Sequence, residues 1–131
     1  MNYGYPPASP RASRGLRPQS EFEFQTARGL RRAVDGLSED QLDTRYKNWS
    51  IRQIVHHLAD SHVHSYIRFK WALTEELPTI KPYDEGGCAK LEDSLSGEID
   101  SALALYEAIH ARWVQLMRFM SDRAFARTFH H

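Results

Sequence analysis

The sequence predicts an all-α protein, a helical bundle of three long helices joined by short helical turns. Three segments carry apolar residues at helical spacing, and each is long enough to bury one face against its neighbours. The 131 residues fit one domain, and 41% of them are hydrophobic, which is sufficient for a single core. The sequence contains no internal repeat and no convincing strand. Bundles of this kind usually use four helices, although three-helix bundles also exist.

The first helix is predicted from about Ser20 to Val34, ending near Gly36. Its apolar residues recur at mixed spacings of three to five, at Phe22, Ala27, Leu30 and Val34. Residues 1–18 before it contain four prolines and several arginines without acidic neighbours, which predicts a flexible, basic, proline-rich tail. Residues 19–131 are assigned to one helical domain.

The second helix has the clearest start. Ser50 and Gln53 form the pattern of a capping box, and Trp49 with Ile54 fits a hydrophobic staple around it. The helical pattern then continues for about 25 residues until Pro78 ends it. The predicted apolar stripe consists of Ile51, Ile54, Val55, Leu58, Phe69 and Leu73.

The remaining elements are one long helix and three shorter segments. Residues 37–42 predict a short capped turn that leads into an irregular link, and the long connection 76–97 predicts a short helix at 84–91. The third long helix is predicted over 100–120, followed by a short turn at 121–122. Its core-facing residues are predicted to be Ala102, Tyr106, Ile109, Trp113, Leu116, Met117 and Met120.

Charge and composition exclude several classes of protein. Seventeen basic and seventeen acidic residues give a net charge of zero, so we expect no binding to nucleic acid or to an anionic membrane. Cys88 is the only cysteine and cannot form an internal disulfide; it is either an ordinary loop residue or a reactive thiol. No apolar stretch approaches the ~20 residues of a membrane-spanning helix. We therefore expect a cytoplasmic location.

Histidines cluster on the second helix. Four of the seven in the chain lie within residues 56–64. On a helical wheel, His62 falls in the middle of the apolar stripe, whereas His56 and Asp60 lie nearer the far side. The flank between these two faces carries His57, Ser61, His64 and Arg68.

The spacing of these side chains limits how many of them can bind one metal ion. His57 and His64 lie about 10.5 Å apart along the helix axis, at 1.5 Å per residue. Two imidazoles that share a metal must each place a nitrogen ~2.0–2.1 Å from the ion, so this gap is too long. His56 and Asp60 have the i, i+4 spacing that permits chelation, but on the face that we expect to be solvated. One helix therefore supplies at most one or two ligands.

Each histidine also has a structural interpretation. For His62 and His110 it is a hydrogen-bonded position in or beside the core. For His57, at the boundary between core and cavity, the pattern leaves both interpretations open. The other four have solvated or rim positions, or at the C-terminus a tag remnant or a broken motif: His56, His64, His130 and His131.

The string WSIRQIVHHLADSH at 49–62 resembles the second-helix signature of the DinB/YfiT-like family of metal-dependent hydrolases and transferases, and of its YfiT subgroup most closely. The resemblance covers about residues 28–131. Further matching strings lie at 37–46, 66–70, 73–76, 78–85, 101–113 and 127–129. One departure is the dipeptide Lys47-Asn48, which stands where the family usually has a longer glycine-rich turn.

The resemblance implies an up-down-down-up four-helix bundle in which three histidines bind one divalent metal, nickel or zinc. The first ligand matches His57. The other two belong to an H-x-x-x-H pair on a fourth helix, which we expect beyond His131, so the chain represents the family fold truncated to three long helices. Candidates for residues that support the ligand or line the cavity are Asp60, His62, His64 and His110.

The family implies a metal-dependent hydrolase, or a transferase that joins a low-molecular-weight thiol of the bacillithiol type to an electrophilic small molecule. A metal ion lowers the pKa of bound water or thiol and so supplies a nucleophile near pH 7. Because two of the three ligands are expected beyond His131, we expect this chain to be catalytically incomplete, and no catalytic residue is assigned.

The alternative is a non-catalytic helical protein, an interaction module or a truncated remnant that is stable as a homodimer. In that case Leu58, Trp113 and Met117 are expected to be exposed in the monomer and to form an apolar patch that the second copy covers.

Overall fold

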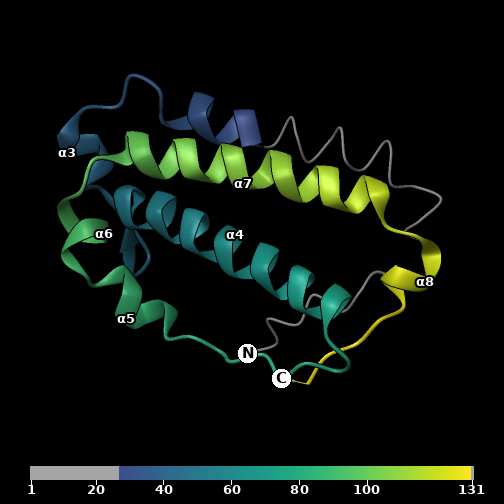
Figure 1. The fold of residues 1–131 in the computed structure, drawn as a ribbon. Coiled ribbons are helices and arrows are strands. Elements are labelled where there is room, and N and C mark those ends of the chain that lie inside the picture. The colour runs from purple at the N-terminus through teal and green to yellow at the C-terminus, as the bar shows by residue number, and fades with distance from the viewer. Residues whose placement is uncertain (1–26, 131) are drawn as a thin grey trace.

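The computed structural model describes residues 27–130, and two long helices dominate them, α4 (Ile51–Thr74) and α7 (Ile99–Phe119) (Figure 1). A shorter helical stretch at 27–34 packs against both, which confirms the all-α fold. The predicted tail, the first helix before residue 27 and His131 lie outside the described residues. The short elements are α3 (Glu39–Leu42), β1 (Arg45–Tyr46), β2 (Trp49–Ser50), α5 (Glu85–Ala89), α6 (Glu92–Ser96) and α8 (Asp122–Phe125).

Helices α4 and α7 run in the same direction. Contacts between them advance along both helices, from the His62–His110 hydrogen bond to the Phe69–Trp113 ring contact. The stretch 27–34 runs the opposite way (Figure 1). Parallel neighbours need a long return connection, and residues 75–98 supply it with α5 and α6. These are the first three steps of the expected up-down-down-up order.

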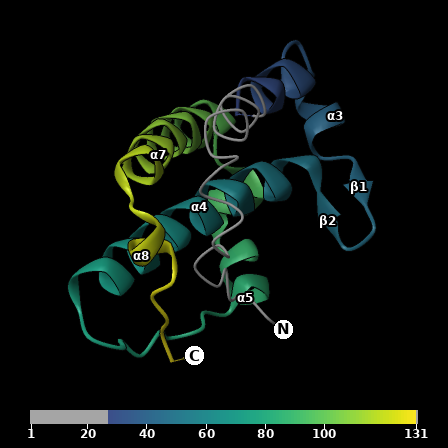
Figure 2. The same cartoon turned by 90° about the vertical axis from the view of Figure 1, so that its right-hand side faces the viewer.

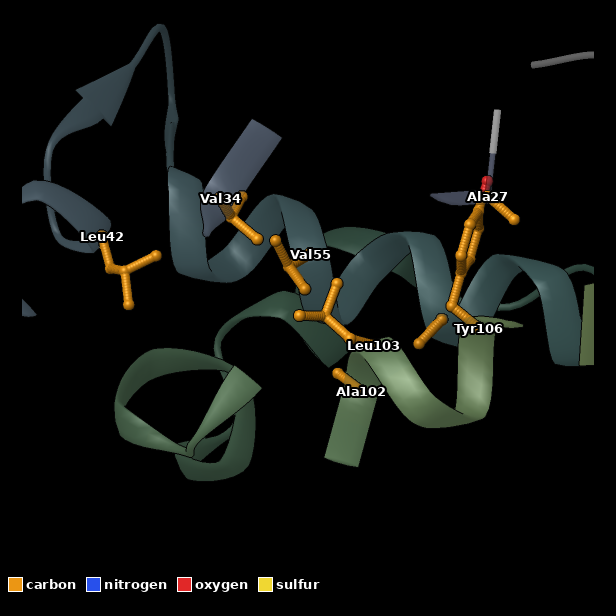
Figure 3. Close-up of a cluster of buried hydrophobic side chains, with 8 residues drawn as sticks. Ala27, Val34, Leu42, Val55, Ala102, Leu103 and Tyr106 are labelled. Carbon is orange, nitrogen blue, oxygen red and sulfur yellow. The ribbon is translucent and has the colours of Figure 1, made fainter. Parts of the chain in front are cut away.

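The core lies where α4, α7 and the stretch 27–34 meet. Figure 3 shows Val55 of α4 and Leu103 of α7 pointing toward one another. Val55 is 1% exposed and Leu103 is 3% exposed. The full cluster of buried residues is Ala27, Val34, Leu42, Val55, Ala59, Ala102, Leu103 and Tyr106.

The predicted capping box at the start of α4 is confirmed. The Ser50 hydroxyl accepts the Gln53 backbone N–H at 3.1 Å, and the Gln53 side-chain oxygen accepts the Ser50 N–H at 2.9 Å. The Gln53 amide nitrogen also donates to the Ala89 carbonyl at 2.7 Å, which attaches α5 to the first turn of α4. The cap therefore sets the helical register and fixes one neighbouring element.

The prediction of no convincing strand was wrong. β1 and β2 form a two-stranded antiparallel hairpin in which Tyr46 pairs with Trp49 (Figure 2). Lys47 takes a left-handed conformation with φ 59°, which allows the two-residue turn Lys47-Asn48. Strands of two residues are too short to show an alternating pattern and therefore leave no signal in the sequence.

The buried positions of α4 differ from the predicted apolar stripe. Of that stripe only Val55 is fully buried, because α4 lies between α7 on one side and α5 and α6 on the other (Figures 1 and 2). Half of its buried residues are therefore polar or charged, and three of these are bonded to neighbouring segments, namely Arg52, Gln53 and Arg68. The buried residues are Arg52, Gln53, Val55, Ala59, Ser65, Tyr66, Arg68 and Ala72.

Arg52 shows how a buried cation is accommodated. Its side chain is 3% exposed and donates to the Asp43 carboxylate and to the Gly97 carbonyl, both at 2.9 Å. It also pairs with Glu39 of α3. Because α3 with its C-cap and the residue Gly97 supply three acceptors, the charge is satisfied and the start of α4 is joined to α3 and to the approach to α7.

The elements after α4 include two that were expected at these places and one that was not. The expected short helix at 84–91 is α5, capped by Asp84, and α6 follows it without having been predicted. The expected turn after α7 is the four-residue helix α8. Arg127 then donates to the Ala72 carbonyl at 2.5 Å and to the Glu75 carbonyl at 2.7 Å, which caps the end of α4.

Across the described residues, every helix is too short or too polar to cross a membrane.

Replacing Ser50 by alanine is expected to lower the free energy of unfolding by about 1 kcal/mol, because a buried helix N-cap is lost. Denaturant unfolding measures the change. Ser101→Ala, at an exposed position in the first turn of α7, is the matched control and is expected to leave stability almost unchanged. Equal effects of the two substitutions would show that the cap contributes nothing specific.

Candidate functional site

The candidate site is one face of α4, on which His57, Ser61, His64 and Arg68 recur at intervals of four, three and four residues. We call this set the polar face. Its first three residues are half-buried and Arg68 is buried. Polar side chains that are only partly exposed to water, on a helix that otherwise packs in a bundle, are typical of a binding-site wall.

His57 does not project into bulk solvent. It is half-buried, and its ring lies edge-to-face with Trp49, with the ring centroids 4.8 Å apart. Trp49 belongs to β2, so the hairpin that the sequence did not predict holds the side of this imidazole. This contact orients the residue that the family resemblance assigns as a metal ligand.

His64 lies two turns further along α4 and is held by the loop that follows the helix. Its ring stacks on Tyr83, with the centroids 3.9 Å apart and the planes 14° apart. Arg68 donates to the Lys81 carbonyl at 2.9 Å and so fixes the same loop. Burial lowers the pKa of His64, and the charge of Arg68 lowers it further.

Asp60 borders the polar face among several charged groups. Burial raises the pKa of its carboxyl, and the negative charge of Asp93 raises it further. Three histidines act in the opposite direction, namely His56, His64 and His57. His56 itself is anchored, because its Nε2 lies 3.2 Å from the Gly97 carbonyl oxygen.

His62 and His110 lie on the other side of α4, in the interface with α7. His62 Nε2 is 2.9 Å from His110 Nδ1, and the His62 ring packs against Tyr106 and Trp113. Burial, followed by the neighbouring His110, lowers the pKa of His62 to about 4. Both residues therefore occupy hydrogen-bonded core positions, away from the polar face.

The apolar patch that we expected in a monomer is only partly exposed. Leu58, Trp113 and Met117 are half-buried, because Trp113 packs between the rings of His62 and Phe69. The large apolar residues with the most exposed surface lie elsewhere. On α4 and α7 they are Ile67, Trp71, Leu105 and Phe119.

The described residues do not by themselves fit a three-histidine metal site. Within residues 27–130, no group of three histidine, cysteine or acidic side chains is arranged to hold an ion. His62 and His110 bond to each other, and His56 bonds to a backbone carbonyl. His57, which the family resemblance implies as a ligand, stays a candidate on this helix.

Comparison with known proteins identifies the family of this chain. A family model described as the DinB superfamily matches residues 23–131. The chain belongs to the DinB superfamily. YfiT of Bacillus subtilis is 49% identical over 104 residues, which cover 78% of this chain and 58% of YfiT. Relatives from Oceanobacillus iheyensis and Bacillus mycoides are 49% and 46% identical over 104 residues, which cover 78% of this chain and 60% of each.

The DinB-superfamily fold is also seen in a solved structure. The structure of Bacillus subtilis YfiT superposes with a TM-score of 0.85 at 43% identity, covering 88% of this chain and 67% of that one. It is described as a probable metal-dependent hydrolase with an unusual four-helix bundle topology. The chain thus spans roughly three-fifths of the length of the curated relatives above.

Sequence reasoning missed two residues of the site. Trp49 was predicted only as part of a hydrophobic staple, and in the structure its ring also contacts the functional candidate His57. Tyr83 was only part of a matching string in the long connection, and it stacks on His64. Both contacts join residues from different elements, so helical spacing on α4 alone could not reveal them.

The buried His62 predicts a specific pH dependence of stability. Because its pKa is lowered in the folded state, its contribution is fully present above pH 6.5 and is lost as the pH falls toward about 4. Urea unfolding across this window is expected to show a midpoint that falls with pH. In His62→Gln the fall is expected to be smaller, and an unchanged pH dependence in that variant would contradict the assignment.

Proposed function

We propose that this chain forms part of a metal-dependent hydrolase or thiol S-transferase site, in which His57 supplies one nitrogen ligand to a divalent nickel or zinc ion. Membership of the DinB superfamily and the description of YfiT as a probable metal-dependent hydrolase support this assignment. The observation that carries it is the position of His57, half-buried on the polar face and oriented by Trp49.

His57 is suited to this role by its surroundings. Imidazole is the commonest nitrogen ligand of zinc and nickel in proteins, and a ligand ring is usually held by contacts around it. Trp49 restricts the ring from one side, and the capping box fixes the helix turn just before it. The side chain is therefore restrained before any ion arrives.

The remaining ligands are proposed to lie outside residues 27–130. Since no three potential ligand side chains within residues 27–130 are arranged to hold one ion, we propose that the 131-residue chain binds metal weakly and is catalytically incomplete. The proposed substrates are a low-molecular-weight thiol with an electrophilic small molecule, or a hydrolysable small molecule. The polar face accommodates either class, because its groups can hydrogen-bond to a thiol, a hydroxyl or a carbonyl.

Calorimetric titration of the purified, tag-free chain with Zn²⁺ tests the role of His57. The wild type is expected to show weak binding at one site. His57→Ala is expected to weaken it about tenfold or more, which corresponds to at least ~1.4 kcal/mol.

His130→Ala is the matched control, because His130 is exposed and takes part in the fold through backbone hydrogen bonds to Pro78 and Ile80. This variant is expected to bind Zn²⁺ as the wild type does. Binding that survives in His57→Ala and disappears in His130→Ala would overturn the proposal.

A further inference from the structure

His64 differs from the other histidines of α4 in what its ring nitrogens contact. His62 is bonded to His110, and His56 is bonded to the Gly97 carbonyl. Within residues 27–130, His64 has ring and electrostatic contacts but no hydrogen bond to either nitrogen. Its nitrogens are therefore available to a small molecule on the polar face.

The His64 ring is also restrained. Tyr83 stacks on it in a nearly parallel arrangement, and the Tyr83 ring has the Arg68 guanidinium 5.9 Å from its centroid. Arg68 is 8% exposed and bonded to the Lys81 carbonyl, so the loop that carries Tyr83 is attached to α4. A restrained ring with available nitrogens loses little entropy when it binds or reacts.

We propose that His64 is the proton-accepting residue of the polar face, held in place by Tyr83. This inference rests on the proposed function, because it concerns the same face as His57. The two residues lie about 10.5 Å apart along the helix axis, so they contact different parts of one small substrate. Tyr83 is then a positioning residue, since it acts through His64.

The electrostatics around His64 suit a proton acceptor. The charged and titratable groups that face it are Arg68 and Asp60 on α4, Tyr83 in the loop and Glu85 on α5. Burial and Arg68 lower its pKa, and the two carboxylates oppose them without reversing the shift. The imidazole is therefore mostly neutral at pH 7 and can take up a proton.

The proton step is balanced in both proposed reactions. The S–H bond of a thiol, or an O–H bond of water, breaks, and its proton moves to an imidazole nitrogen of His64. The electron pair left on sulfur or oxygen forms the new bond to the electrophilic carbon. The leaving group departs with the electron pair of the broken bond and takes the proton back from His64.

Acylation by diethyl pyrocarbonate, mapped by mass spectrometry over a range of pH, tests this proposal in the full 131-residue chain. The reagent attacks unprotonated imidazole nitrogens. His64 is expected to react about tenfold faster than His62, whose modification requires the helix interface to open. Its rate is expected to follow an apparent pKa below the ordinary 6.5.

Two substitutions of Tyr83 provide the controls. Tyr83→Phe retains the stacked ring and is expected to leave the rate and apparent pKa of His64 unchanged. Tyr83→Ala uncovers His64, and its apparent pKa is expected to rise toward 6.5. The circular dichroism spectrum of each variant reports whether the fold is retained.

Two results would overturn the inference, namely acylation of His64 no faster than that of His62, or an apparent pKa of 6.5 or above in the wild type. Neither depends on metal binding. If His57→Ala binds Zn²⁺ as tightly as the wild type, the proposed function is refuted. An unreactive His64 refutes only this inference.

Discussion

Helices α4 and α7 pack side by side in the same direction, and most other features of the molecule follow from that packing. Val55 and Leu103 fill the interface near its start, and His62 and His110 bond across its middle. Because parallel helices cannot be joined by a tight turn, the chain returns through residues 75–98. That return places Tyr83 beside the polar face of α4.

His62 and His64, two residues apart on α4, have different environments because α7 and the return connection lie on different sides of this helix. A helix turns about 100° per residue, so His62 and His64 point in directions about 160° apart. His62 meets the aromatic side chains of α7, while His64 meets Tyr83 from the return connection. Burial lowers the pKa of both. The His62 ring is hydrogen-bonded to His110, whereas the His64 ring has no hydrogen bond to its nitrogens within residues 27–130.

The sequence predicted the regular, local parts of this structure. The capping box at Ser50, the extents of α4 and α7 and the shared flank of His57 and His64 all follow from short-range chemistry and helical spacing. It did not predict the hairpin or the burial of Arg52, whose three acceptors come from two separate segments. Contacts between distant segments are set by tertiary packing, which helical periodicity does not encode.

Broadening of histidine-ring NMR signals by paramagnetic Ni²⁺ tests most directly whether His57 is the ligand that this face of α4 presents. The signal broadens most for rings nearest the ion, so binding is located without an activity assay. The His57 ring is expected to broaden at the lowest Ni²⁺ ratio, ahead of His62 and His110. A His57 ring that stays sharp while any other ring within residues 27–130 broadens would contradict it.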